Sequence, residues 1–234
     1  MKFIRKKNVS AVVNNQVAQN APLFKFLGSF MKFLYILIIG LLLCGCTSEA
    51  IYNQNTEIAP VDNSLQIDKT LQKTFIYVDS EDFLNQNIAP SSHLGNDKSL
   101  DINLGKFASG ASARFFKNYL TNISETTNQD VLNSNNLIIM PKITNFTYGF
   151  YSPDGIDVSA KPYVNYNLNL KIFKNQKLIY NKNISSNEKN YGEEQFFGSG
   201  DGLIDEIAPI FQKAIANDFN LHAIELIDTI NLAK

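Results

Sequence analysis

The stretch Tyr163 to Phe173, YVNYNLNLKIF, determines the fold that we expect for this chain. Its two parities differ: Val164, Tyr166, Leu168, Leu170 and Ile172 are apolar, whereas Asn165, Asn167, Asn169 and Lys171 are polar. Such alternation predicts a strand of an antiparallel sheet that has one face on the core and one face in water.

The segment before it, Leu137 to Tyr151 (LIIMPKITNFTYGFY), predicts a second strand. Its core-facing parity is expected to be that of Ile138, Met140, Thr144, Phe146, Tyr148 and Phe150. Pro141 cannot donate to a sheet ladder, so it indicates an edge position or a bulge. Ser152-Pro153-Asp154-Gly155 then predicts a turn, since each of these residues suits a turn position.

A third strand is expected after the tight connection Lys174-Asn175-Gln176, with Leu178, Tyr180 and Ile184 apolar. Further towards the N-terminus, Phe75 to Val78 predicts a first core strand, and Leu100 to Leu104 a brief one. The three long strands therefore predict an antiparallel meander.

Two helical regions flank this meander. Lys106 to Ile123 has apolar residues at spacings of three and four, ending with Phe116, Tyr119, Leu120 and Ile123, and its small residues from Ala108 to Ala113 indicate close core packing. The last helix is expected to begin near Ala208 with Pro209 in its first turn; a start near Leu203 predicts a kink instead.

This order of elements predicts an α+β fold. We expect a two-layer sandwich in which an antiparallel sheet carries two helices on one face.

Composition restricts the possible functions of the 234-residue chain. Its net charge is −1, and its basic cluster, Arg5-Lys6-Lys7, lies near the start, so the sequence predicts no nucleic-acid partner. The two cysteines are Cys44 and Cys46. If the chain is cleaved between Cys44 and Cys46, the mature part has no disulfide framework and no thiolate metal site. We therefore expect no metal and no cofactor.

An export signal is expected from Met31 to Gly45. Lys32 provides a basic start, Phe33 to Leu43 is an apolar run, and small residues follow it. A membrane-spanning helix needs roughly 17–25 apolar residues, so this run is too short to span a bilayer. A charged start, a short apolar region and a small residue at the cut describe a signal peptide that is removed.

Leu43-Cys44-Gly45-Cys46 resembles the lipobox of bacterial lipoproteins, although Ala or Ser is usual where Cys44 stands. The resemblance implies cleavage between Gly45 and Cys46, a diacylglycerol on the Cys46 sulfur and an acylated amine, so that the membrane is a partner through the lipid. An ordinary secretory signal and an uncleaved anchor are the alternatives. Thr47 in place of Asp resembles the sorting pattern of outer-membrane lipoproteins and implies an outer-membrane protein that faces the periplasm.

These signals divide the chain into four parts. Residues 1–30 are an over-long gene prediction with the true start at Met31, or else an extended basic region of the signal. Residues 31–45 are the signal, residues 46–70 are a polar segment that predicts a flexible tether, and residues 71–234 form the periplasmic domain.

Few residues are candidates for chemistry. Gly198-Ser199-Gly200-Asp201-Gly202 lacks the spacing of a phosphate-binding loop, and His93 and His222 belong to no metal motif. The acidic clusters Glu193-Glu194 and Asp201/Asp205/Glu206 could serve glycoside hydrolysis, but solvated charge is the simpler interpretation. We therefore predict no catalytic residues.

The element order between Phe75 and Ile230 resembles YajG-type envelope lipoproteins and, less closely, the LptE type. The first resemblance implies a non-catalytic lipoprotein whose domain docks onto a protein assembly of the cell envelope. The second implies an accessory in lipopolysaccharide export. A membrane-tethered periplasmic hydrolase is the alternative from another class.

Overall fold

The computed structural model describes residues 47–57, 73–153, 155, 158–198 and 200–233. These residues belong to one compact unit, Cys46–Lys234. The expected signal and the residues before it lie outside the described part of the chain.

The meander predicted from the alternating segments is confirmed. Strands β6 (Leu137–Tyr151), β7 (Ser159–Lys174) and β8 (Lys177–Asn183) pair antiparallel in chain order. Asn175 and Gln176 connect β7 to β8 with φ values of 52° and 64°. Two consecutive residues with positive φ form the type I′ turn that suits the twist of a two-residue hairpin.

The large sheet is mixed, which corrects the prediction of a purely antiparallel one. Strand β2 (Thr74–Tyr77) lies between β6 and β5 (Ile123–Thr126) and is parallel to both. The short strands β9 (Asn190–Tyr191) and β10 (Gln195–Phe196) pair with β7 on the side that does not face β6. Parallel neighbours need long connections, so they leave no local signal in the sequence.

A bulge in β6 changes which side chains face the core. The register with β7 shifts between Thr144 and Thr147, and Asn145 has a φ of 53°. Leu137, Ile139 and Ile143 join the core before the bulge, and Phe146, Tyr148 and Phe150 join it afterwards. The predicted single parity is therefore right only for the second half, because one extra residue reverses the alternation.

Pro141 lies inside β6, where it pairs with Leu170 of β7. The pairing of β6 with β2 ends at Ile139. At Pro141, β6 therefore has no β2 neighbour that would need a backbone N–H as donor. The predicted edge environment is thus confirmed at Pro141, whereas Leu137–Ile139 at the start of β6 pair with both β7 and β2.

The helices are α2 (Leu104–Phe116), α3 (Asp201–Asp205), α4 (Ile207–Leu221) and α5 (Ala223–Leu232), with 3₁₀ turns at Ser80–Phe83 and Gln129–Asn133. Helix α2 is shorter than predicted. The Asn118 amide donates to the carbonyls of Arg114 and Phe115 and satisfies groups that a longer helix would bond internally. Pro209 lies in the first turn of α4, as predicted, and separate helices replace the single C-terminal one.

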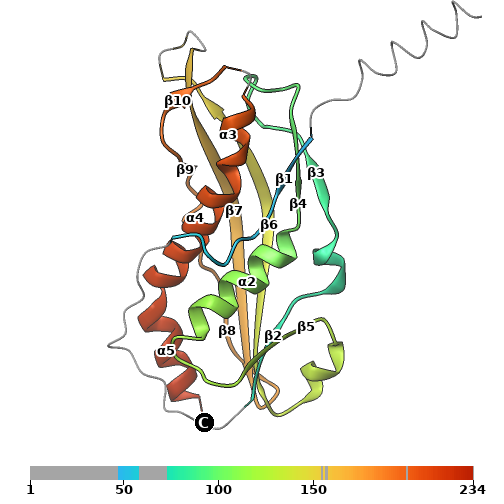
Figure 1. The fold of residues 1–234 in the computed structure, drawn as a ribbon. Coiled ribbons are helices and arrows are strands. Elements are labelled where there is room, and N and C mark those ends of the chain that lie inside the picture. Colours follow the sequence, from blue (N-terminus) through green and yellow to red (C-terminus); the bar gives the residue numbers. More distant parts are fainter. Residues whose placement is uncertain (1–46, 58–72, 154, 156–157, 199, 234) are drawn as a thin grey trace, which may run out of the picture. The chain divides into compact units, whose positions relative to one another are not determined.

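Helices α2 and α4 cover one face of the large sheet (Figure 1). Phe211 of α4 lies at the centre of this layer, with ring centroids 4.9 Å from Phe107 of α2, 4.7 Å from Phe146 of β6 and 4.9 Å from Tyr166 of β7. Phe211 and Phe107 are fully buried. This packing confirms the α+β class with helices on one sheet face.

A second, three-stranded sheet has the order β1–β4–β3. Strand β1 (Thr47–Ala50) is parallel to β4 (Ser99–Ile102), and β3 (Gln86–Ile88) is antiparallel to β4. The predicted strand near Leu100 is confirmed as β4. Strand β4 leads directly into α2, whose first turn is capped by Asn103 as its side chain accepts from the N–H of Lys106 at 2.9 Å.

Candidate functional site

The candidate site is the segment that directly follows the expected lipidation residue. Leu43, Cys44, Gly45 and Cys46 lie outside the described residues, and the described chain begins at Thr47. Thr47 is the first residue of β1 and pairs with Ser99, with 3.1 Å between their hydroxyl oxygens. A flexible tether was predicted from residue 46 to residue 70, and for Thr47–Glu57 that prediction is wrong.

Tyr52 attaches the next part of this segment to α2. Its ring lies edge-on to Phe107 with the centroids 5.6 Å apart. A Cβ at Gly110 would lie 2.5 Å from the Tyr52 ring, so the glycine provides the space that the ring occupies. Arg114, one turn further along α2, donates to the carbonyl of Thr56 at 2.8 Å.

Gln212 of α4 holds the same segment from the other side. Its amide nitrogen donates to the carbonyl of Asn53 at 2.8 Å, and its oxygen accepts from the N–H of Asn53 at 3.1 Å. The hydroxyl of Thr56 also donates to this oxygen at 3.1 Å. Because Gln212 is only 3 % exposed, these bonds replace the water that its amide would otherwise need. The segment is therefore part of the folded domain.

A surface hollow of about 440 Å³ lies beside this segment and α2. Tyr52 and Gly110 border it together with Lys106, Arg114 and Glu125. The Glu125 carboxylate also accepts a bond of 2.5 Å from the Ser109 hydroxyl. Lys117 borders the hollow as well, so its lining holds three cationic side chains and one carboxylate.

Two residues of the acidic clusters, Glu194 and Asp201, form ion pairs with lysines. Glu194 accepts from Ser159 at 2.6 Å and lies 3.8 Å from the Lys161 ammonium. Asp201 pairs with the mostly buried Lys98 at 2.8 Å. Each of these two carboxylates thus has its own lysine. Both carboxylate side chains remain partly exposed to solvent.

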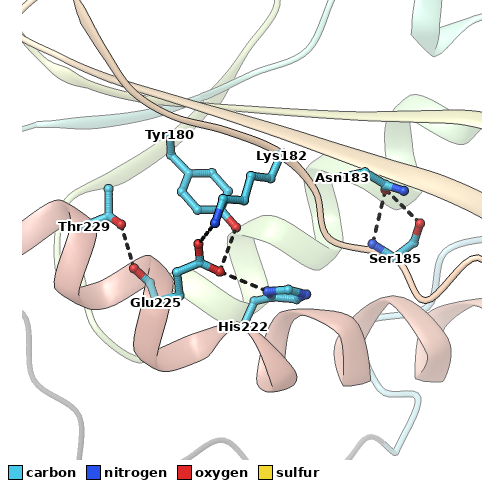
Figure 2. Close-up of polar contacts among 7 residues, drawn as sticks. All are labelled: Tyr180, Lys182, Asn183, Ser185, His222, Glu225 and Thr229. Atoms are coloured by element: carbon cyan, nitrogen blue, oxygen red, sulfur yellow. Dashed lines mark hydrogen bonds and ion pairs between the residues drawn. The ribbon is translucent and has the colours of Figure 1, made fainter.

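The two histidines lie in different surroundings. His93 is exposed in the loop between β3 and β4. His222 separates α4 from α5, and its Nδ1 lies 3.3 Å from a carboxylate oxygen of Glu225 (Figure 2). Lys182 of β8 also pairs with Glu225, and the Tyr180 hydroxyl donates to the same carboxylate at 3.4 Å.

Charge and burial shift the pKa values in this cluster. The bond from Lys182 holds the pKa of Glu225 below its usual value. Burial, together with the nearby Glu225 charge, raises the pKa of Tyr180 to about 12. At neutral pH the cluster therefore contains a carboxylate, an ammonium and a neutral phenol. The cluster links α5 to β8 at the surface of the domain.

A separate polar pair, Tyr166 and Asp218, is buried in the core. The Tyr166 hydroxyl donates to Asp218 at 2.5 Å, and Asp218 is 5 % exposed. Burial raises the pKa of Asp218 to about 6 and also raises the pKa of Tyr166. Neither residue borders the hollow beside α2. Sequence reasoning placed Tyr166 in the core but did not identify Asp218.

The described residues contain no group of three or more His, Cys, Asp or Glu side chains that could hold a metal ion. Within the same part of the chain, no helix is long and apolar enough to cross a membrane.

Sequence reasoning also missed Gln212 and Tyr52, which form the candidate site with Gly110. Gln212 contacts Asn53 across 159 positions of sequence, so no local pattern could have paired them. The run of small residues in α2 was the one available signal, since it predicted close approach by a neighbour.

Comparison with known proteins gives a partial likeness of fold. No family model matches the chain, and no curated protein matches its sequence. A Xanthomonas campestris protein of the family DUF330 has a TM-score of 0.46 at 10 % identity, with 79 % of this chain and 95 % of that chain covered. A neuraminyllactose-binding hemagglutinin homologue from Helicobacter pylori has a TM-score of 0.39 at 9 % identity, with 75 % of this chain and 98 % of that chain covered.

Proposed function

We propose that this chain is a bacterial lipoprotein, exported by residues 31–45, cleaved before Cys46 and held on the periplasmic face of the outer membrane by acyl chains on that cysteine. Two acyl chains, at about 0.8 kcal/mol per buried CH₂, anchor a protein stably where one chain binds only reversibly. In this proposal the anchor itself provides the membrane affinity, with no need for a spanning helix.

One observation carries this proposal. The described residues belong to one compact unit, Cys46–Lys234, and the expected cleavage site lies directly before that unit. Strand β1 then begins at Thr47, so cleavage before Cys46 releases the folded unit without removing any described strand or helix.

For the domain itself we propose a non-catalytic role, in which it docks onto a larger protein assembly of the envelope. Support comes from the separate lysine partners of Glu194 and Asp201, since a pair of hydrolytic carboxylates must face a shared substrate. The hydrolase alternative predicts turnover of peptidoglycan or glycans that disappears in Glu194→Gln. An accessory role in lipopolysaccharide export predicts an outer-membrane barrel as the partner.

Metabolic labelling with palmitate, followed by separation of the inner and outer membranes, tests the anchor. We expect label on the wild-type protein and on Cys44→Ser, and none on Cys46→Ser. The matched Cys44 variant removes a thiol two residues away and controls for damage to the signal. Label that persists in Cys46→Ser would overturn the proposal. Crosslinking in cells, with co-purification from the outer membrane, then identifies the docking partner.

A further inference from the structure

Four apolar side chains are exposed at one end of the large sheet, and we call them the apolar patch. Phe196 is 76 % exposed, Tyr151 and Tyr191 are each 50 % exposed, and Val158 is 49 % exposed. The ring centroids of Tyr151 and Tyr191 are 6.0 Å apart, and the N–H after Phe196 donates to the carbonyl of Val158 at 2.9 Å. The members therefore form two pairs, Tyr151 with Tyr191 and Phe196 with Val158. Exposed apolar side chains that gather at one end of a sheet mark an interaction site more often than single exposed residues do.

The three aromatic members lie on the sheet face that the helices leave uncovered. Their partners on β7 are Lys161 for Tyr151, Tyr163 for Tyr191 and Ser159 for Phe196. Directly paired residues share a face, and these partners all have odd numbers. The core-facing residues of β7 have even numbers, from Ala160 to Ile172. The patch therefore faces away from α2 and α4.

The patch lies at the same end of the domain as the start of β1 (Figure 1). Thr47 pairs with Ser99, and the adjacent Lys98 forms an ion pair with Asp201 at 2.8 Å. Helix α3, which begins at Asp201, follows the patch residue Phe196 closely in the chain. Phe197 then packs on Phe150 with centroids 5.7 Å apart, next to Tyr151 of the patch. Thr47, the residue that follows the proposed anchor at Cys46, therefore lies at this end of the domain.

We propose that the apolar patch lies against the surface of the bilayer that holds the acyl chains of Cys46; this inference rests on the proposed lipid anchor. Because β1 follows Cys46 immediately and is hydrogen-bonded to β4, there is no slack to carry this end of the domain away from the membrane. Tyrosine is enriched where membrane meets water, and lysine stems extend there toward the headgroups. Lys161 and Lys189 flank the tyrosines, with the Lys189 ammonium 4.0 Å from the centroid of Tyr163.

Tryptophan fluorescence provides the test, because the chain contains no tryptophan. The Phe196→Trp variant is expressed in cells, where it is cleaved and lipidated. The mature protein is then placed in vesicles of phosphatidylcholine with bromine on the acyl chains. Bromine quenches only an indole that reaches the interface or the acyl region. We expect several-fold stronger quenching of this tryptophan than of the control.

Leu232→Trp is the matched control, since Leu232 is 79 % exposed and lies at the far end of the domain. Lys174 at the end of β7 contacts Ile230 of α5, whereas Ser159 at the start of β7 pairs with Phe196. Sixteen strand residues at about 3.3 Å each separate these ends by about 50 Å. An indole at position 232 should therefore stay unquenched.

The outcomes separate the inference from the anchor. Vesicle flotation with strong quenching at position 196 alone supports both. Flotation with equal quenching at positions 196 and 232 overturns the inference and leaves the anchor in place. A protein that carries no palmitate and does not float with the vesicles overturns the anchor, and the inference with it.

Discussion

Replacement of Asp218 by asparagine should make the domain more stable at neutral pH and leave its stability unchanged in acid. The carboxyl is buried, and the loss of hydration raises its pKa from 3.8 to about 6, although the Tyr166 hydroxyl, the Ser186 backbone and His222 favour the charged form. A shift of about two units corresponds to about 3 kcal/mol, at about 1.4 kcal/mol per unit.

The direction of the pH dependence follows from proton uptake. Between pH 3.8 and about 6 the folded protein holds this proton more tightly than the unfolded chain does. The contribution of Asp218 to stability is therefore fully present below about pH 4 and is lost as the pH rises through about 6. Above that range the folded domain contains a buried charge that is only partly compensated by its hydrogen bonds.

Asp218→Asn removes the charge and keeps an oxygen that can accept from the Tyr166 hydroxyl. Urea unfolding of the mature chain at pH 4, 5, 6, 7 and 8 gives the difference in unfolding free energy between variant and wild type. We expect a difference near zero at pH 4 that grows to as much as about 3 kcal/mol in favour of the variant by pH 7 to 8. Asp205→Asn, at an exposed position, is the control and should show no such trend.

A difference that is the same at every pH would refute this reasoning. So would a variant that becomes relatively less stable as the pH rises, because the ionised carboxylate would then stabilise the fold. The first result would mean that hydrogen bonds to Asp218 balance the cost of its burial, and the second that they outweigh it.

Three further predictions concern the core, the candidate site and the surface. Phe219→Ala removes a fully buried ring that stacks on Phe115 at 5.0 Å, and urea unfolding should show a loss of about 3–5 kcal/mol. Gln212→Ala breaks both bonds to the backbone at Asn53, so limited proteolysis should cut near that residue faster than in the wild type or in the exposed control Lys213→Ala; equal rates would contradict the role of Gln212. Lys182→Ala, which breaks an exposed ion pair with Glu225, should cost less than about 1 kcal/mol in the same unfolding assay, and a larger loss would show that the cluster is essential to the fold.

Local patterns predicted the central part of the fold well. The alternation around Tyr166 and Leu168 defined β7, and the polar connection at Asn175 placed the following hairpin. These features depend on residues that are close in sequence, where side-chain periodicity is a direct consequence of strand geometry.

The errors have a common physical origin in interactions between distant residues. Strand β2 pairs parallel to β6. The start of the predicted tether is ordered because Gln212 bonds to the backbone at Asn53 and Gly110 leaves space for the Tyr52 ring. Asn145 lies within an alternating segment, and nothing in that local pattern marked it as the bulge that reverses the parity of β6. None of these contacts leaves a periodic signal.

The most direct test of the account is the mass of the N-terminal tryptic peptide of the protein isolated from membranes. The sequence has no Lys or Arg between Cys46 and Lys69, so trypsin should release residues 46–69 as one piece. We predict that this peptide begins at Cys46 and carries the mass of a diacylglycerol and an amide-linked acyl chain. A peptide that extends upstream of Cys46, or one with an unmodified cysteine, would contradict the account.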